Sequence, residues 1–183
     1  MALLYLSLGS NLGPRKETME RAISEIEERI GQLVARSAFL ETRPWGFSSQ
    51  HDFLNACITV RTNCSPQKCL QITQQIEREL GRLQKSDGQY HDRAIDIDLL
   101  FYDELICQGK NLLLPHPLLH KRQFVLEPLC QIAPDLEHPV LKKKVVELLA
   151  DLTEDLKGQI PLEDNQQKDS QQQGPNNQAE NQR

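Results

Sequence analysis

The chain has 183 residues, of which 38% are hydrophobic and 26% are charged, and its formal net charge is −5. A mildly acidic chain without a block of lysine and arginine lacks the charge pattern of a general nucleic-acid-binding protein. No apolar run approaches the roughly 20 residues that a membrane-spanning helix needs. Five cysteines without a CxxC pair fit neither a disulfide framework nor a zinc site. We therefore expect one globular domain in the cytoplasm, with no nucleic-acid or membrane partner.

The first part of the chain predicts three strands and one helix. Residues 2–8 are apolar and end at a glycine-rich turn, which is typical of a strand. Apolar side chains then recur at helical spacing over residues 14–30, where a glycine ends the pattern. Residues 33–42 and 53–62 predict the second and third strands, separated by a loop that contains proline, glycine and serine.

A second helix and a fourth strand complete a βαββαβ order. Ser65 followed by Pro66 is a typical helix start, and Gly81 lies just beyond the last apolar position of the helix. Residues 84–91 are polar and predict a loop, whereas residues 94–102 have strong strand propensity. The order predicts an α+β protein with a ferredoxin-like core in three layers, α-β-α.

The C-terminal part predicts additions to this core and then a tail. Residues 106–114 predict a further strand, and residues 120–132 and 141–156 predict helices. From residue 159 onward glutamine and asparagine dominate, and such a segment cannot bury enough apolar surface to offset its ordering entropy. We expect a folded domain over 1–158 and a disordered tail over 159–183.

The sharpest local motif is a pair of aspartates in the fourth strand. Residues two apart on a strand share a face, so Asp96 and Asp98 point the same way and the apolar residues between and beside them face the core. Two adjacent carboxylates repel each other unless a cation lies between them, and hard oxygen ligands favour Mg²⁺ with phosphate oxygens. The alternative is an edge strand with a solvated polar face.

Basic residues near these aspartates favour phosphate chemistry. Arg82 and Arg93 flank the polar loop that contains Lys85, and guanidinium groups with Mg²⁺ stabilise a transferring phosphoryl group. His116 lies between two prolines, shortly before Arg122, in a stretch that could grip phosphate. The alternative is that these arginines form ordinary surface ion pairs.

A third cluster predicts a site for a flat heterocycle. Trp45 lies in a loop beside proline and glycine, and Phe53 is followed two residues later by Asn55. An aromatic ring can stack on a heterocycle while an amide hydrogen-bonds its edge. The alternative is that Phe53 belongs to the core and Trp45 anchors the loop. The glycine-rich turn over 9–13 lacks the spacing of a P-loop and predicts a strand-to-helix turn near the site.

In combination these segments resemble the 6-hydroxymethyl-7,8-dihydropterin pyrophosphokinase family over residues 2 to about 157. Each motif is weak alone, but five in this order are specific. The matching segments are YLSLGSNLG at 5–13, FLN at 53–55, GR at 81–82, DRAIDIDLL at 92–100, PHP at 115–117 and RQFVLEPL at 122–129.

The resemblance implies an enzyme that transfers pyrophosphate from ATP to a pterin alcohol in folate biosynthesis, and we expect it to be a monomer. Two Mg²⁺ ions would be held by Asp96 and Asp98. The implied catalytic residues are Arg82, Arg93, Asp96 and Asp98. The implied ATP-binding residues are Gln74, Glu77, Lys85, Leu99, His116 and Arg122. The implied pterin-binding residues are Thr42, Arg43, Trp45, Phe53, Asn55 and Phe124, with the ring between the two phenylalanines.

Two departures and two rival functions remain open at this point. The family often has an Arg-Trp-Gly-Pro-Arg stretch before the aspartates, whereas this chain has QYHDR at 89–93, and Tyr90 is the counterpart we expect for the tryptophan. One rival is another magnesium-dependent phosphotransferase or nuclease, which would leave the heterocycle cluster unused. The other is a non-catalytic ferredoxin-like binding module for RNA, against which the acidic balance and the paired aspartates argue.

Overall fold

The computed structural model describes residues 1–46, 49–81 and 92–158. Two residues that we expect in the site, Arg82 and Lys85, lie outside the described residues, and so do Tyr90 and the whole of the predicted tail. None of the helices in the described ranges combines the length and apolar character that crossing a bilayer demands.

Five strands form one antiparallel sheet in the order β2-β4-β1-β5, with β3 paired to β4. This is the predicted ferredoxin-like core, and β1 lies at its centre. The strands are β1 (Ala2–Ser10), β2 (Gly31–Arg36), β3 (Leu40–Thr42), β4 (Phe53–Thr62) and β5 (Asp96–Tyr102).

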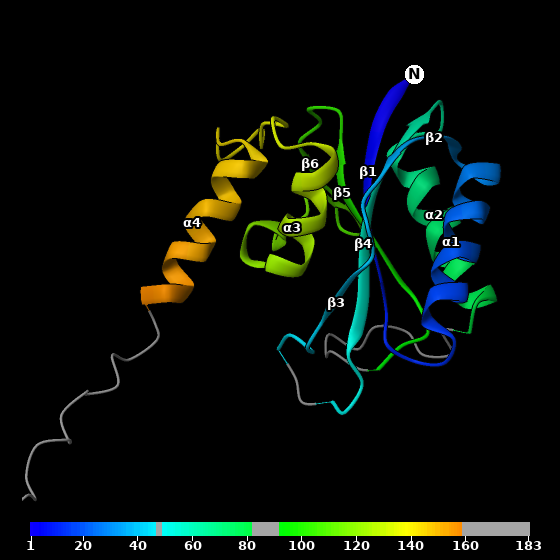
Figure 1. Ribbon diagram of the computed structural model, residues 1–183. Helices are drawn as coiled ribbons and strands as arrows, with labels where there is room; N and C mark the ends of the chain where they lie inside the picture. Colours follow the sequence, from blue (N-terminus) through cyan, green and yellow to red (C-terminus); the bar gives the residue numbers. More distant parts are fainter. Residues whose placement is uncertain (47–48, 82–91, 159–183) are drawn as a thin grey trace, which may run out of the picture.

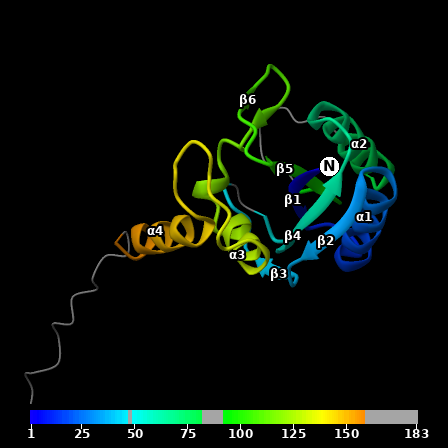
Figure 2. The ribbon, with the colours of Figure 1, turned by 90° about the horizontal axis from the view of Figure 1, so that it is seen from above.

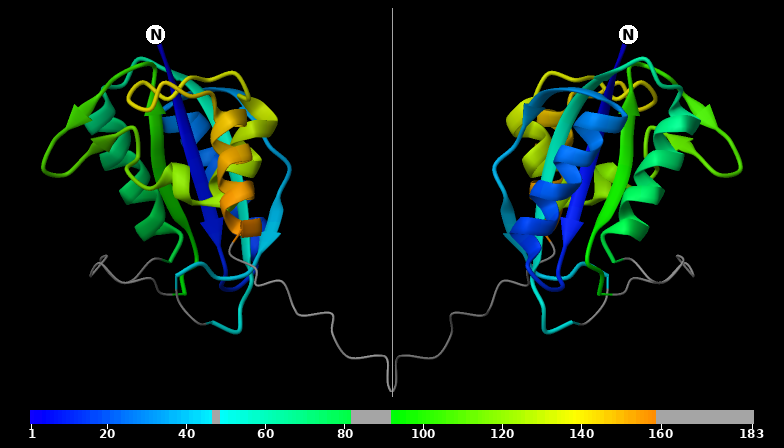
Figure 3. Two further views of the ribbon diagram at one scale, coloured as in Figure 1. Left: turned by 90° about the vertical axis from the view of Figure 1, so that its left-hand side faces the viewer. Right: turned by 90° about the vertical axis from the view of Figure 1, so that its right-hand side faces the viewer.

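Helices cover both faces of this sheet, which gives the predicted three layers (Figures 1 and 2). One face carries α1 (Arg15–Arg29) and α2 (Pro66–Glu79), as the right-hand view of Figure 3 shows. The other face carries α3 (Gln123–Ile132), against which α4 (Val145–Gly158) packs. The C-terminal additions also include a hairpin of β6 (Cys107–Gln108) and β7 (Leu113–Leu114), and the 3₁₀ turn η1 (Leu119–Lys121).

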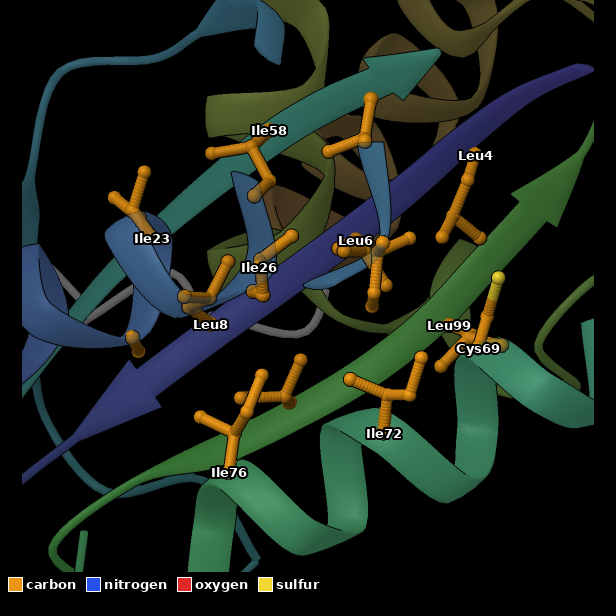
Figure 4. Close-up of a cluster of buried hydrophobic side chains, with 14 of the residues drawn as sticks. Leu4, Leu6, Leu8, Ile23, Ile26, Ile58, Cys69, Ile72, Ile76 and Leu99 are labelled. Atoms are coloured by element: carbon orange, nitrogen blue, oxygen red, sulfur yellow. The ribbon is translucent and has the colours of Figure 1, made fainter. Parts of the chain in front are cut away.

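The central strand divides its side chains between two apolar clusters. Leu4, Leu6 and Leu8 are fully buried against α1 and α2, where they meet apolar residues of both helices and of the neighbouring strands (Figure 4). Tyr5 points to the opposite face and packs beneath α3 and α4. At about 25 cal/mol per Å² of apolar surface, this two-sided burial is the main stabilisation of the fold, and it makes the sheet a rigid support.

Three predicted elements were wrong in detail. The strand expected over 33–42 is divided into β2 and β3, because the Ser37 hydroxyl accepts a hydrogen bond from the Cys57 main-chain NH at 2.9 Å and the chain bends there. The helix expected from residue 141 begins only at Val145, since Lys142 has a left-handed φ of 55°. The strand expected over 106–114 is two short strands joined by a turn.

Candidate active site

Three neighbouring strands present polar residues side by side at one end of the sheet. The end of β1 meets the beginnings of β4 and β5, so that Gly9 lies opposite Asn55 on one side and Asp96 on the other. Two residues earlier on the same face, Ser7 lies opposite Asp98. The register of the sheet therefore places the Asn55 amide and the two carboxylates on strands that flank β1. Regular strand pairing, and not a loop, fixes the spacing between these groups.

These residues line a pocket of about 520 Å³, part of which opens to solvent. Both Asp96 and Asp98 point into it, while Ile95, Ile97 and Leu99 are buried on the other face of β5. The lining residues are Ser7, Gly9, Thr42, Arg43, Trp45, Phe53, Asn55, Arg93, Asp96, Asp98, Arg122 and Phe124.

An arginine accompanies each carboxylate. Arg93 Nη1 lies 2.7 Å from Asp96 Oδ2, and Arg122 Nη1 lies 3.3 Å from Asp98 Oδ2. The Arg122 side chain is only 8% exposed, so this pair is screened by solvent far less than a surface pair. Each carboxylate thus has a cationic neighbour that can turn to a phosphate when another cation binds the aspartates.

The donor set suits Mg²⁺ bound together with a phosphorylated ligand. Over residues 1–46, 49–81 and 92–158, no three His, Cys, Asp or Glu side chains are grouped closely enough to hold a metal by themselves. Mg²⁺ usually keeps several waters and takes one or two carboxylates plus substrate phosphates, whereas zinc sites usually have three or four His, Cys, Asp or Glu ligands from the protein. Two aspartates on a rigid strand fit the first description.

Another part of the pocket lining is aromatic, and Arg122 borders it as well as Asp98. The Trp45 and Phe124 rings have centroids 6.1 Å apart and are tilted by 57°, and the Arg122 guanidinium lies 5.5 Å from the Trp45 ring. Asn55 is 2% exposed and its Nδ2 donates to Thr42 Oγ1 at 2.8 Å, which fixes the amide. This part can hold a flat ring by stacking and by hydrogen bonds to its edge.

The outer edge of β5 carries two more of the expected residues. Glu77 on α2 is buried, and its Oε1 accepts a hydrogen bond from the Ile97 main-chain NH at 2.8 Å. The pairing of β1 with β5 shifts by one residue at Leu100, and the Leu100 carbonyl accepts a hydrogen bond from the His116 NH at 2.9 Å. The Glu77 side chain and the His116 main chain are therefore both hydrogen-bonded to the strand that bears the aspartates.

His116 is held neutral by its surroundings. Burial and the positive charge of Arg122 lower its pKa to about 4, although Asp96 acts in the opposite direction. Its Nδ1 accepts a hydrogen bond from the Leu118 NH at 3.2 Å, so the proton of the neutral ring is on Nε2. At neutral pH the residue is an uncharged hydrogen-bond donor rather than a cation.

The expected residues differ in how they relate to the pocket. All six expected for the pterin line it, and Arg93, Asp96, Asp98 and Arg122 do so as well. Gln74 is exposed on α2, outside this lining, and the Leu99 side chain lies in the core, so a nucleotide could meet Leu99 only through its main chain.

Sequence reasoning did not select Ser7, Gly9 or Asn11. The glycine-rich sequence over 9–13 predicted only a turn near the site. In the structure Gly9 lines the pocket, and Asn11 binds the main chain of Arg93. A signal existed for Gly9, because a residue without a side chain at the end of a buried strand often marks a close approach.

Fold and pocket together indicate the class of α+β proteins whose cavity combines carboxylates and arginines, suited to a phosphorylated ligand, with aromatic rings and an amide, suited to a flat ring. Comparison with known proteins narrows this class. The sequence matches the 7,8-dihydro-6-hydroxymethylpterin-pyrophosphokinase (HPPK) family over residues 5–134. The chain belongs to this family.

Individual relatives agree with this assignment. The chain is 52% identical over 141 residues to the 2-amino-4-hydroxy-6-hydroxymethyldihydropteridine pyrophosphokinase of Porphyromonas gingivalis, covering 76% of this chain and 95% of the relative. It is 38% identical over 147 residues to the enzyme of the same name from Aquifex aeolicus, covering 80% and 90%. The structure of wild-type Plasmodium falciparum HPPK-DHPS with pteroate matches at a TM-score of 0.71 and 16% identity, which shows the shared fold. That match covers 86% of this chain and 43% of the larger protein.

Proposed function

We propose that this protein transfers pyrophosphate from ATP to the hydroxymethyl group of 6-hydroxymethyl-7,8-dihydropterin and releases AMP, a step of folate biosynthesis. The observation that carries the proposal is that a single pocket joins an aromatic and amide end to a carboxylate and arginine end. A metal-dependent phosphotransferase of another kind would have no use for the first end, and a binding module would have no use for the second.

The pterin binds at the aromatic end. Its ring lies against Phe53 and Phe124 with Trp45 beside it, and Asn55 hydrogen-bonds the ring edge. Because Asn55 Nδ2 already donates to Thr42, its Oδ1 is the atom directed to the pterin NH groups. The bond to Thr42 thereby selects a donor-rich ring edge such as that of an aminopterin.

ATP binds at the other end. Asp96 and Asp98 would hold two Mg²⁺ ions, which would supply positive charge to neutralise the phosphate oxygens. Arg93 and Arg122 then exchange their carboxylate partners for phosphate oxygens, and neutral His116 donates a hydrogen bond from Nε2. Further ATP contacts are proposed for Gln74, Glu77, Lys85, Leu99 and Arg82.

The chemical step requires positioning and charge stabilisation more than covalent participation of the protein. The pterin hydroxymethyl oxygen attacks the β-phosphorus, the bond between that phosphorus and the α,β-bridging oxygen breaks, and AMP leaves with the bridging electron pair. The proton of the hydroxyl group passes to solvent. Arg93 stabilises the charge that develops on the transferring group, as preorganised guanidinium groups do. We propose that the enzyme works in the cytoplasm as a monomer.

An AMP-formation assay with hydroxymethyldihydropterin, ATP and Mg²⁺ tests the proposal. We expect one AMP for each pterin pyrophosphate, with no AMP in the absence of pterin. Formation of ADP, or of AMP at the same rate without pterin, would overturn it in favour of another phosphotransferase. Calorimetry with a non-hydrolysable ATP analogue separates the remaining alternative, since a binding module would show no Mg²⁺-dependent affinity for the analogue.

A further inference from the structure

Asn11 is a buried polar residue immediately after the central strand, and it is not among the pocket-lining residues. Its side chain is 3% exposed. Its main-chain NH donates to the Arg93 carbonyl at 3.1 Å, and its Oδ1 accepts from the Arg93 NH at 2.7 Å. This reciprocal pair continues the β1–β5 ladder beyond the last paired residues, Gly9 and Asp96.

The Asn11 amide nitrogen contacts Asp92, which precedes Arg93, and one further segment of the chain. Nδ2 donates to Asp92 Oδ1 at 2.6 Å and to the His51 carbonyl at 3.4 Å. His51 belongs to the loop between β3 and β4 that carries Arg43 and Trp45. One amide group therefore contacts the loop at the aromatic end of the pocket and the backbone that carries Arg93.

The contacts continue to the aspartates. Arg93, whose main chain Asn11 holds from both sides, places its guanidinium 2.7 Å from Asp96. Arg15, the first residue of α1, contacts only the side of the site that β3 and the following loop form: it donates to the Asp52 carbonyl at 2.6 Å and to Glu41 Oε1 at 2.7 Å. The segment after β1 thus contains one residue that contacts both sides of the site, Asn11, and one that contacts a single side, Arg15.

We propose that Asn11 is a positioning residue that fixes the Arg93 main chain relative to the pterin loop, so that the guanidinium is aligned only when both segments are in place. This inference rests on the proposed function. Asparagine suits the role because it supplies one acceptor and two donors from a short, planar group. Alanine at this position removes these bonds from the Arg93 NH and the His51 carbonyl in a partly buried setting.

A double-mutant cycle tests this role. The variants are Asn11→Ala, Arg93→Ala and the double variant, with Asn111→Ala as the control because Asn111 is exposed on the hairpin of β6 and β7. A displacement of about 1 Å at a reacting group costs on the order of 100-fold in rate, so we expect Asn11→Ala to lower kcat by about 100-fold. We expect ATP affinity to change by less than about threefold, and single-turnover AMP formation in the Arg93→Ala background to fall by less than about threefold on adding Asn11→Ala.

Each result of this cycle decides for or against the inference. A loss of about 100-fold that persists in the Arg93→Ala background overturns it, because a residue that only stabilises the fold would reduce the active fraction equally in both backgrounds. A kcat of Asn11→Ala within about twofold of wild type also overturns it. Absence of AMP formation by the wild type would instead refute the proposed function.

A second variant covers the case in which Asn11→Ala does not fold. Asn11→Asp keeps the acceptor for the Arg93 NH but places a carboxylate next to Asp92 Oδ1 and removes both donors. We expect it to lower kcat by about tenfold or more while ATP affinity is retained, with the same non-additivity towards Arg93→Ala. Wild-type kcat in a folded Asn11→Asp variant would contradict the inference.

Discussion

Lowering the pH should destabilise the nucleotide-free protein through His116. The folded protein holds the pKa of this imidazole at about 4, against 6.5 for an ordinary histidine, so folding disfavours its charged form. Above pH 6.5 the ring is neutral in both states and nothing is lost. As the pH falls from 6.5 towards 4, the unfolded chain gains a proton that the folded chain does not bind, and stability decreases.

The size of this loss follows from the two pKa values. With values of about 4 and 6.5, the protonation of His116 lowers the free energy of unfolding by roughly 2 to 3 kcal/mol at pH 4.5 and by almost nothing at pH 7.5. His116→Gln keeps a polar side chain of similar reach but cannot titrate. We therefore expect wild type to lose roughly 2 to 3 kcal/mol more than His116→Gln between these two pH values.

Denaturant unfolding of both proteins at both pH values, in the presence of a chelator, measures this difference. The carboxylates titrate in wild type and variant alike, so their contribution cancels in the comparison. Parallel loss of stability in the two proteins would refute the reasoning, as would an NMR titration that places the imidazole midpoint near 6.5. Either result would mean that the ring is solvated and can carry charge at the site.

Three substitutions probe the pocket itself. Asp98→Ala should lower kcat by on the order of 1,000-fold with an unchanged circular dichroism spectrum, because bound metal contributes several kcal/mol to transition-state stabilisation; full activity would remove the metal assignment. Arg93→Ala should reduce kcat by on the order of 100-fold and ATP affinity far less, and equal losses in single-turnover and binding experiments would argue against a transition-state role. Gly9→Ala places a methyl group 3.0 Å from Asn55 Oδ1, so calorimetry should show pterin affinity weaker by about tenfold and ATP affinity unchanged; undiminished pterin binding would show that the amide is not used.

Hydrophobic periodicity was sufficient to predict the strands and helices that have one apolar and one polar face. The strand expected over 53–62 has those bounds in the structure, and the helix that begins after Ser65 is capped by that side chain, which accepts from the Lys68 NH at 3.3 Å. The aspartate pair in β5 was equally accessible, since alternation along a strand fixes which side chains share a face. These features depend on residues close together in the sequence.

What could not be predicted depends on residues distant in the sequence. The break between β2 and β3 depends on the Cys57 NH of β4, which donates to the Ser37 hydroxyl instead of to a main-chain carbonyl. Asn11 looks like an ordinary polar residue until the fold brings the Arg93 main chain to it, and the family resemblance that selected Glu77 does not reveal its hydrogen bond with the Ile97 NH. Hydrogen bonds of this kind leave no periodic trace in the sequence, because each satisfies a single group at a single position.

The register of three strands fixes the distance between the two groups of side chains in the pocket. Adjacent strands lie about 4.8 Å apart, so the main chain sets Asn55 and Asp96, on either side of Gly9, about 10 Å from each other. In the proposed arrangement, with the ring at Asn55 and the phosphates at Asp96, an acceptor whose alcohol projects further from its ring would carry its oxygen past the phosphorus. Lengthening this reach would require a strand to slip, and a slip of one residue turns every side chain to the wrong face. The enzyme should therefore tolerate substituents on the ring of the acceptor better than a change in the distance from the ring to the hydroxyl group.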